Sequence, residues 1–240
     1  YVRVATGYRP GGPNVVAINP ATGEQFAPST FEADTLTSYE AGFKAETADR
    51  RLALDLAAYL IDWNDMHVSV TNGGFSAIGN ASGGATIKGG ELSVTARPAE
   101  GLVIAGAFAY QDAELNENEP SLGAIEGERL PNVPRFTAAL RADYSYRDSE
   151  LSPTVGATVR YVSQRNSSFD GAATYVQSRL PDYTLVDLRA GVTLADVEVQ
   201  GYVSNVFDVR GQLSAFNWRG TNMPSITPPR TVGVSLRTRF

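Results

Sequence analysis

The sequence predicts an all-β fold, an antiparallel up-and-down meander of about ten long strands, with residues 1–240 forming one unit. Runs in which apolar and polar residues alternate recur along the whole chain, and apolar residues do not recur at helical spacing beyond a few turns. Most of these runs extend over about 11–14 residues, which exceeds the about 5–6 residues of a usual globular strand. The connectors between the runs alternate between long and short.

Ten strands are expected from these runs. In chain order they span residues 1–8, 36–47, 52–65, 84–97, 102–114, 135–147, 151–164, 182–194, 197–208 and 230–240. Short polar turns join four pairs of strands, at 47–50, 98–101, 148–150 and 195–196. Long connectors that carry Gly, Ser, Asn or acidic residues join the others, at 9–34, 66–83, 115–134, 165–181 and 209–228.

The lengths of the connectors distinguish the two ends of the predicted sheet. In a meander every second connector lies at the same end, so all the long connectors share one end and all the short turns share the other. Outer-membrane β-barrels have this asymmetry, with long extracellular loops and short periplasmic turns, whereas a β-sandwich has no reason for it. The alternation therefore favours a membrane β-barrel.

Charged residues on one face of the strands favour the same fold. In the sixth expected strand, Leu140 and Tyr144 alternate with Arg141 and Asp143. A charged side chain that faces lipid at the bilayer midplane costs about 2–4 kcal/mol, so the charged face is expected to line a water-filled lumen. Ion pairs are expected on this face among Arg141, Arg160, Arg189, Arg237, Arg239, Glu40, Asp143 and Asp187.

The composition argues against several classes of function. The net charge of −6 argues against a nucleic-acid partner, which requires a basic face. The chain has no Cys for a disulfide, a thiolate metal site or a nucleophile, and a single His cannot build a histidine metal site. No nucleophile elbow, phosphate-binding loop or dinucleotide fingerprint occurs, so we expect neither catalysis nor a cofactor. No stretch of about 18 apolar residues predicts a membrane-spanning helix.

Two further features have ordinary explanations. Acidic residues gather at the end of the fifth expected strand and in the connector after it, namely Asp112, Glu114, Glu117, Glu119, Glu126 and Glu128. Calcium favours several carboxylates, but the spacing of an EF-hand is absent, so a solvated acidic loop is expected. The single histidine, His67, is expected to lie on the surface of a loop.

Several motifs resemble those of a known family. Residues 36–44 read LTSYEAGFK, 130–135 read LPNVPR, 183–191 read YTLVDLRAG, 203–208 read VSNVFD and 229–236 read PRTVGVSL. In this order and at this spacing they resemble barrel strands of TonB-dependent outer-membrane receptors. The resemblance implies the C-terminal part of a 22-stranded transmembrane β-barrel. This chain would hold its last ten strands, with Tyr1 a cut end and with the plug domain and the first twelve strands absent.

The resemblance also implies a function. The protein would be an active transport receptor in the bacterial outer membrane that takes up a scarce nutrient, expected to be a ferric siderophore or a similar metal chelate. Energy would come from the TonB complex, which would be contacted through the missing N-terminal region. Outer-membrane lipid would surround the barrel, and the barrel-assembly machinery would read Phe240 as the closing aromatic residue.

Arg and aromatic residues in the long connectors are the candidates for ligand binding. Together such side chains can hold an anionic, ring-bearing chelate by ion pairing and stacking. The candidates are Arg9, Arg165, Tyr175, Arg179, Phe216, Trp218 and Arg219. The alternative is ordinary solvated loop surface, since loops are usually polar without forming sites.

Two other functions stay open at the level of sequence. The first is a passive, porin-like outer-membrane barrel that is complete in itself, because ten is an allowed even number of strands. The second is a soluble β-rich binding module, lectin-like or propeller-like. The second alternative requires the apolar faces of the strands to be buried against protein.

Overall fold

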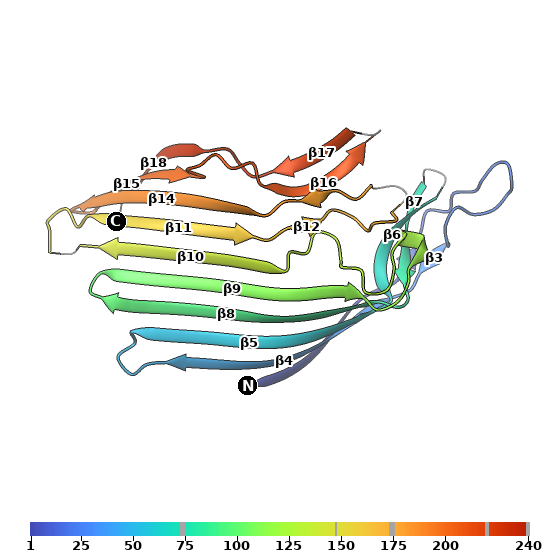
Figure 1. Ribbon diagram of the computed structural model, residues 1–240, viewed down its shortest axis with the longest axis horizontal. Coiled ribbons are helices and arrows are strands. Elements are labelled where there is room, and N and C mark those ends of the chain that lie inside the picture. The colour runs from blue at the N-terminus through green and yellow to red at the C-terminus, as the bar shows by residue number, and fades with distance from the viewer. Residues whose placement is uncertain (73–74, 147, 173–175, 219–220, 239–240) are drawn as a thin grey trace.

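Ten strands form a single antiparallel sheet in the computed structural model, which describes residues 1–72, 75–146, 148–172, 176–218 and 221–238. The order of strands in the sheet is β1-β4-β5-β8-β9-β10-β11-β14-β15-β18, so each strand pairs with the next long strand of the chain (Figure 1). A 3-10 turn, η1 (Pro120–Leu122), is the only helical element in these ranges. The predicted all-β meander is therefore confirmed.

The ten strands follow the expected runs closely. They are β1 (Val2–Arg9), β4 (Asp34–Glu46), β5 (Leu52–Asn64), β8 (Ala85–Ala99), β9 (Leu102–Leu115), β10 (Phe136–Ser145), β11 (Thr154–Val162), β14 (Tyr183–Leu194), β15 (Val197–Ser204) and β18 (Thr231–Thr238). The two end strands of the sheet are β1 and β18. No helix in the described ranges has the length and apolar character to cross a membrane.

Four of the long connectors carry short ladders of their own, which the sequence did not predict. They are β2–β3 (Gly12–Pro13, Thr30–Phe31), β6–β7 (Met66–Asn72, Phe75–Ala81), β12–β13 (Arg165–Asn166, Arg179–Leu180) and β16–β17 (Gln212–Trp218, Thr221–Ile226). Figure 1 shows these ladders at one end of the sheet and the short turns at the other. We call the end of the sheet that carries the ladders the loop end. The predicted separation of long loops from short turns is confirmed.

The two faces of the sheet differ in chemistry because successive residues of a strand point to opposite sides. Leu140 of β10 lies opposite Gly106 of β9 and Val159 of β11, and Leu140 and Val159 are exposed. In β18, Val232, Val234 and Leu236 are 70–73% exposed. The outer face is thus apolar and unburied. The inner face carries the charged residues of the same strands.

The hydrophobic core lies under the loops instead of within the sheet. Its buried members come from the β6–β7 hairpin, from β8, from the end of β9 and from two loops, and they are Met66, Ala81, Ala85, Leu115, Ala124 and Phe169. The loops touch at two glycines, where Gly171 N–H donates to the Gly123 carbonyl at 3.0 Å. A Cβ at Gly123 would lie 1.9 Å from the Gly171 carbonyl oxygen, so only glycine permits this approach.

Two expectations about the loop end are wrong. Asp112 and Glu114 lie in β9 and are not part of a solvated loop, because the chain folds back and pairs Glu114 with Arg129. Asp112 forms ion pairs with Arg129 at 3.4 Å and with Arg135 at 3.1 Å. His67 lies within β6 and its side chain is 11% exposed, so it is not a surface loop residue.

Neighbouring residues of β8 offer a test of the two faces. We predict that Leu92→Arg destabilises the barrel by about 2–4 kcal/mol, since Leu92 shares the outer face with Leu56 and Phe108. Ser93→Arg is the matched control, because Ser93 lines the inner face opposite Asp55. The measurement is the urea concentration at which half of the protein loses the folded band on a gel run without boiling. The protein is isolated from the membrane of the cells that express it. Equal destabilisation by both variants would contradict the assignment of the faces.

Candidate ligand-facing loop end and inner wall

Ion pairs line the inner face of β10, β11, β14 and β15. Arg189 and Arg141 both pair with Asp143, and Arg160 Nη2 lies 2.7 Å from Asp187 Oδ2. The register explains the pair of Arg189 with Asp143, because Gly156 of β11 lies directly opposite both residues and places no side chain between them. Partly exposed pairs of this kind contribute about 0–1 kcal/mol each, so their main effect is to keep charged groups on one face.

The other expected inner-wall residues have different partners. Arg237 lies 4.0 Å from Glu198, a pairing that the sequence did not single out. Glu40 accepts a hydrogen bond from the Tyr1 hydroxyl at 2.7 Å, and no arginine of the described residues pairs with it. Arg239 lies outside the described residues. The expected ion pairs are therefore confirmed for Arg141, Arg160 and Arg189 with Asp143 and Asp187.

Open hollows of polar character follow this inner face. One hollow of about 490 Å³ lies over β4, β5 and β8 and is lined by Tyr1, Glu40, Lys44, Asp55, Tyr59 and Glu91 among others. Another of about 450 Å³ includes Arg141, Asp143, Arg189, Glu198 and Gln200. Such surfaces hold water and polar groups. The described part of the chain gathers no three His, Asp or Glu side chains as a metal site.

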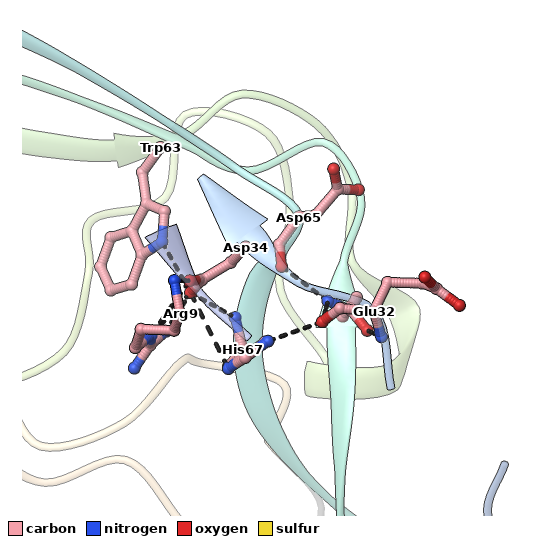
Figure 2. A network of polar contacts seen from close by, with 7 residues as sticks. Arg9, Glu32, Asp34, Trp63, Asp65 and His67 are labelled. Carbon is pink, nitrogen blue, oxygen red and sulfur yellow. Dashed lines mark hydrogen bonds and ion pairs between the residues drawn. The ribbon is translucent and has the colours of Figure 1, made fainter. Parts of the chain in front are cut away.

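A buried carboxylate organises one side of the loop end. Asp34, 2% exposed, accepts hydrogen bonds from Arg9 Nε at 2.9 Å, from Trp63 Nε1 at 3.0 Å and from the His67 backbone N–H at 3.3 Å (Figure 2). The Arg9 guanidinium also lies 5.2 Å from the Trp63 ring centre. Asp34 thus connects β1, β4, β5 and β6. We call this group the Asp34 hub.

The His67 side of the hub fastens the β6–β7 hairpin. His67 Nε2 lies 2.7 Å from the Glu32 carbonyl oxygen, and the imidazole packs edge-on against Phe31 with ring centres 4.9 Å apart. Asn80 Nδ2 donates to the carbonyl oxygens of Asp65 at 2.8 Å and Glu32 at 3.1 Å. The hairpin is therefore held by both of its strands.

The Asp34 hub lies beyond the apolar band of the outer face. Asp34 pairs with Arg9 at the last rung of the β1–β4 ladder. The outer face at this height already carries Thr35, Thr37 and Asp62, which are polar. Outside the lipid region, hydrogen bonds from Arg9, aided by Trp63 and His67, hold the pKa of Asp34 well below its ordinary range, although burial opposes them.

The predicted ligand residues fall into two separate groups. Arg9 lies on β1, the first strand of the sheet, whereas Arg165 and Arg179 follow β11, the seventh. Arg165 and Arg179 lie in the paired strands β12 and β13, and Arg165 hydrogen-bonds the backbone of β16, which carries Phe216. The structure therefore brings Arg165, Arg179 and Phe216 into adjoining loops and leaves Arg9 apart.

Their environments differ. Arg165 is buried, and its Nη2 donates to two carbonyls of β16. Arg179 is exposed and donates to the Gln164 side chain. Phe216 is 47% exposed and lies opposite Met223 in the β16–β17 hairpin. The Trp218 backbone ends β16, whereas Tyr175, Arg219 and Phe240 lie outside the described residues.

Sequence reasoning missed the residue that closes the base of the last long loop. Asn205 is 5% exposed and has a φ of 50°, the left-handed conformation that Asn tolerates. Its Nδ2 donates to the carbonyls of Val209 and Pro228, each at 2.9 Å, so it joins both ends of the loop. The residue sits in the VSNVFD motif, and that motif was the available signal.

The Asp34 hub predicts a pH dependence. Because the folded-state pKa of Asp34 is lowered, its contribution to stability is present above the ordinary pKa of about 3.9 and is lost as the pH falls below it. We expect constant docking of the β6–β7 hairpin from pH 8 to pH 5 and weakening below pH 4. The measurement is the hydrogen-exchange protection of the backbone amides of β6 and β7, corrected for the intrinsic pH dependence of exchange.

Asp34→Asn is the companion variant. It keeps the shape of the side chain but removes the charge-assisted hydrogen bonds, so we expect a loss of roughly 1–3 kcal/mol at pH 7. The acid dependence should also become weaker. An unchanged acid transition in Asp34→Asn would show that another group is responsible.

Comparison with known proteins places the sheet and its loops in a family. Residues 1–206 match the family model described as TonB dependent receptor-like, beta-barrel. The metal-pseudopaline receptor CntO of Pseudomonas aeruginosa is 34% identical over 206 residues, which cover 84% of this chain and 27% of that protein. The ferrichrome outer membrane transporter/phage receptor of Escherichia coli K12 is 28% identical over 204 residues, which cover 82% and 25%.

Solved structures agree with this assignment. The ferric yersiniabactin uptake receptor FyuA from Yersinia pestis superimposes with a TM-score of 0.80 at 25% identity, covering 100% of this chain and 34% of that chain. The ferric-catecholate import receptor Fiu of Escherichia coli K12 has the same fold, with a TM-score of 0.75. The chain spans about a quarter to a third of the length of these proteins. The match of its sequence agrees with its apolar outer face, its charged inner face and its long loops at one end. This chain belongs to the TonB-dependent receptor-like β-barrel family.

Proposed function

We propose that this chain forms part of the wall and of the outer loops of a bacterial outer-membrane receptor. The receptor takes up a metal chelate of the siderophore type with energy from TonB. The observation that carries the proposal is the division of the sheet, with an apolar outer face, an ion-paired inner face and all long loops at one end. Relatives named as receptors for metal-pseudopaline and ferrichrome support the class of cargo.

The division of the sheet suits uptake through a lipid barrier. The apolar outer face would contact outer-membrane lipid, while the polar hollows of the inner wall would offer hydrogen bonds to water and to polar cargo. The TonB complex would act through parts of the receptor beyond this chain. The barrel-assembly machinery would recognise Phe240, which lies outside the described residues.

The loop end supplies side chains suited to a chelate. Arg179 is an exposed cation close to the β16–β17 hairpin, and Phe216 offers an exposed ring on that hairpin. Guanidinium groups pair with anionic oxygens, and aromatic rings pack on ring-bearing ligands. We assign the contacts to Arg179 and Phe216, together with Tyr175, Trp218 and Arg219. Arg9 is a weaker candidate because Asp34 already pairs with it.

The two alternative functions have less support. A soluble β-rich module requires buried apolar faces, whereas Val232, Val234 and Leu236 are exposed. A passive porin shares the sorted faces but needs no energy from TonB. The dependence of uptake on TonB therefore separates the proposed receptor from a porin.

Deletion of the gene and of tonB tests the proposal. Uptake of a panel of radiolabelled ferric and other metal chelates is measured in the parent strain and in both deletion strains. We expect at least one chelate whose uptake at nanomolar concentration is lost in both deletions and is restored by the gene. Uptake that persists without TonB would indicate a passive pore. If neither deletion changes the uptake of any chelate, the proposed class of cargo is contradicted.

Substitution at the loop end tests the assigned contacts. For the chelate so identified, Phe216→Ala is expected to raise the half-saturating concentration about 5–30-fold, since a central aromatic contact contributes about 1–2 kcal/mol. Ile125→Ala is the control, because Ile125 is also an exposed apolar residue, 66% against 47% for Phe216, and lies on a different outer loop. Equal effects of both variants would argue against a specific role of Phe216.

A further inference from the structure

Arg165 is a buried cation without a carboxylate partner in the described ranges. Its exposed fraction is 7%, and no ion pair involves it there. Burying a charge is costly unless hydrogen bonds compensate for lost water. Its side-chain hydrogen bonds in these ranges are two, both from Nη2, to the carbonyl oxygens of Gln212 at 3.0 Å and Leu213 at 2.8 Å.

The two acceptor carbonyls mark an irregularity in the β16–β17 hairpin. The register shifts between Gln212 and Ser214, so Leu213 is the extra residue of a bulge. A bulge disrupts the ladder locally and leaves backbone groups without cross-strand partners. Arg165 therefore binds the hairpin where its own ladder is incomplete.

Within the residues that the structure describes, few other contacts fix the direction of the β16–β17 hairpin. At its base, Asn205 and Thr227 close the loop, with Thr227 Oγ1 donating to the Val209 carbonyl at 2.8 Å. Every residue of β17 is exposed, from Thr221 to Ile226. A two-stranded hairpin alone is marginally stable in water, so its direction depends on the base and on Arg165.

We propose that Arg165 is a positioning residue of the receptor, which fixes the angle of the β16–β17 hairpin and so places Phe216 and Met223 for contact with the chelate. Arg165 itself does not touch the chelate, because its guanidinium is enclosed by protein. The part of this inference that concerns the chelate rests on the proposed function. The part that concerns the hairpin does not.

The chemistry explains why arginine serves here. A guanidinium presents its N–H donors in a planar, fixed arrangement, so Nη2 can donate to both carbonyls at once. A lysine ammonium is a point charge on a flexible stem and fixes the angle less well. Arg165→Lys should therefore retain part of the effect, and Arg165→Met should lose it.

Hydrogen exchange of the native receptor in detergent tests the hairpin without any cargo. We expect Arg165→Met to speed exchange of the amides in 212–216 and 221–226 roughly tenfold or more, with β11 and β14 unchanged and Arg165→Lys between the two. Arg179→Met is the matched control, since Arg179 lies on the same short ladder and bonds a side chain instead of the hairpin backbone. Unchanged exchange in the hairpin, or faster exchange throughout the sheet, would overturn the proposal.

Uptake kinetics then test the consequence for the chelate. Arg165→Met should raise the half-saturating concentration about as much as Phe216→Ala, leave the maximal rate unchanged, and add little to Phe216→Ala in the double variant. Fully additive effects would overturn the link between the two residues. If the parent receptor takes up no chelate, the proposed function fails, while the exchange experiment still decides whether Arg165 positions the hairpin.

Discussion

Each strand of the sheet separates two different environments, and this constraint governs the rest of the structure. Because side chains alternate, a strand can present Leu140 outward and Arg141 inward one residue later. The inward charges then need partners. The register supplies them across strands, as in the pair of Arg160 with Asp187. The ion pairs contribute little stability individually, but they allow one face to be charged while the other stays apolar.

A sheet built in this way has no interior of its own, so its apolar packing moves to the loop end. Met66, Leu115 and Phe169 come from three different segments and meet only there. The backbone hydrogen bond between Gly171 and Gly123 joins two loops directly. The outer loops are consequently not independent flaps, since the β6–β7 hairpin and the loops around residues 115–135 and 163–172 share one core.

The sequence predicted the sheet well because alternation is a local signal. The ninth strand ends at Ser204 instead of residue 208 because Asn205 adopts a left-handed conformation, which alternation does not reveal. The hairpins within the loops were missed for a related reason. The Gly, Ser and Asn content of residues 66–83 predicts a connector, yet Met66–Asn72 pair with Phe75–Ala81, and this hairpin packs on the core.

The loop arginines show where composition stops being informative. Arg9, Arg165 and Arg179 all read as loop cations, but their guanidinium groups have different surroundings: a buried carboxylate, two backbone carbonyls and an exposed amide side chain. These surroundings depend on contacts between segments far apart in the chain, as between Arg165 and Leu213. A cation enclosed by protein can act on a ligand only through the element it holds. The division between residues that hold the loops and residues that face outward is therefore set by tertiary packing and not by residue type.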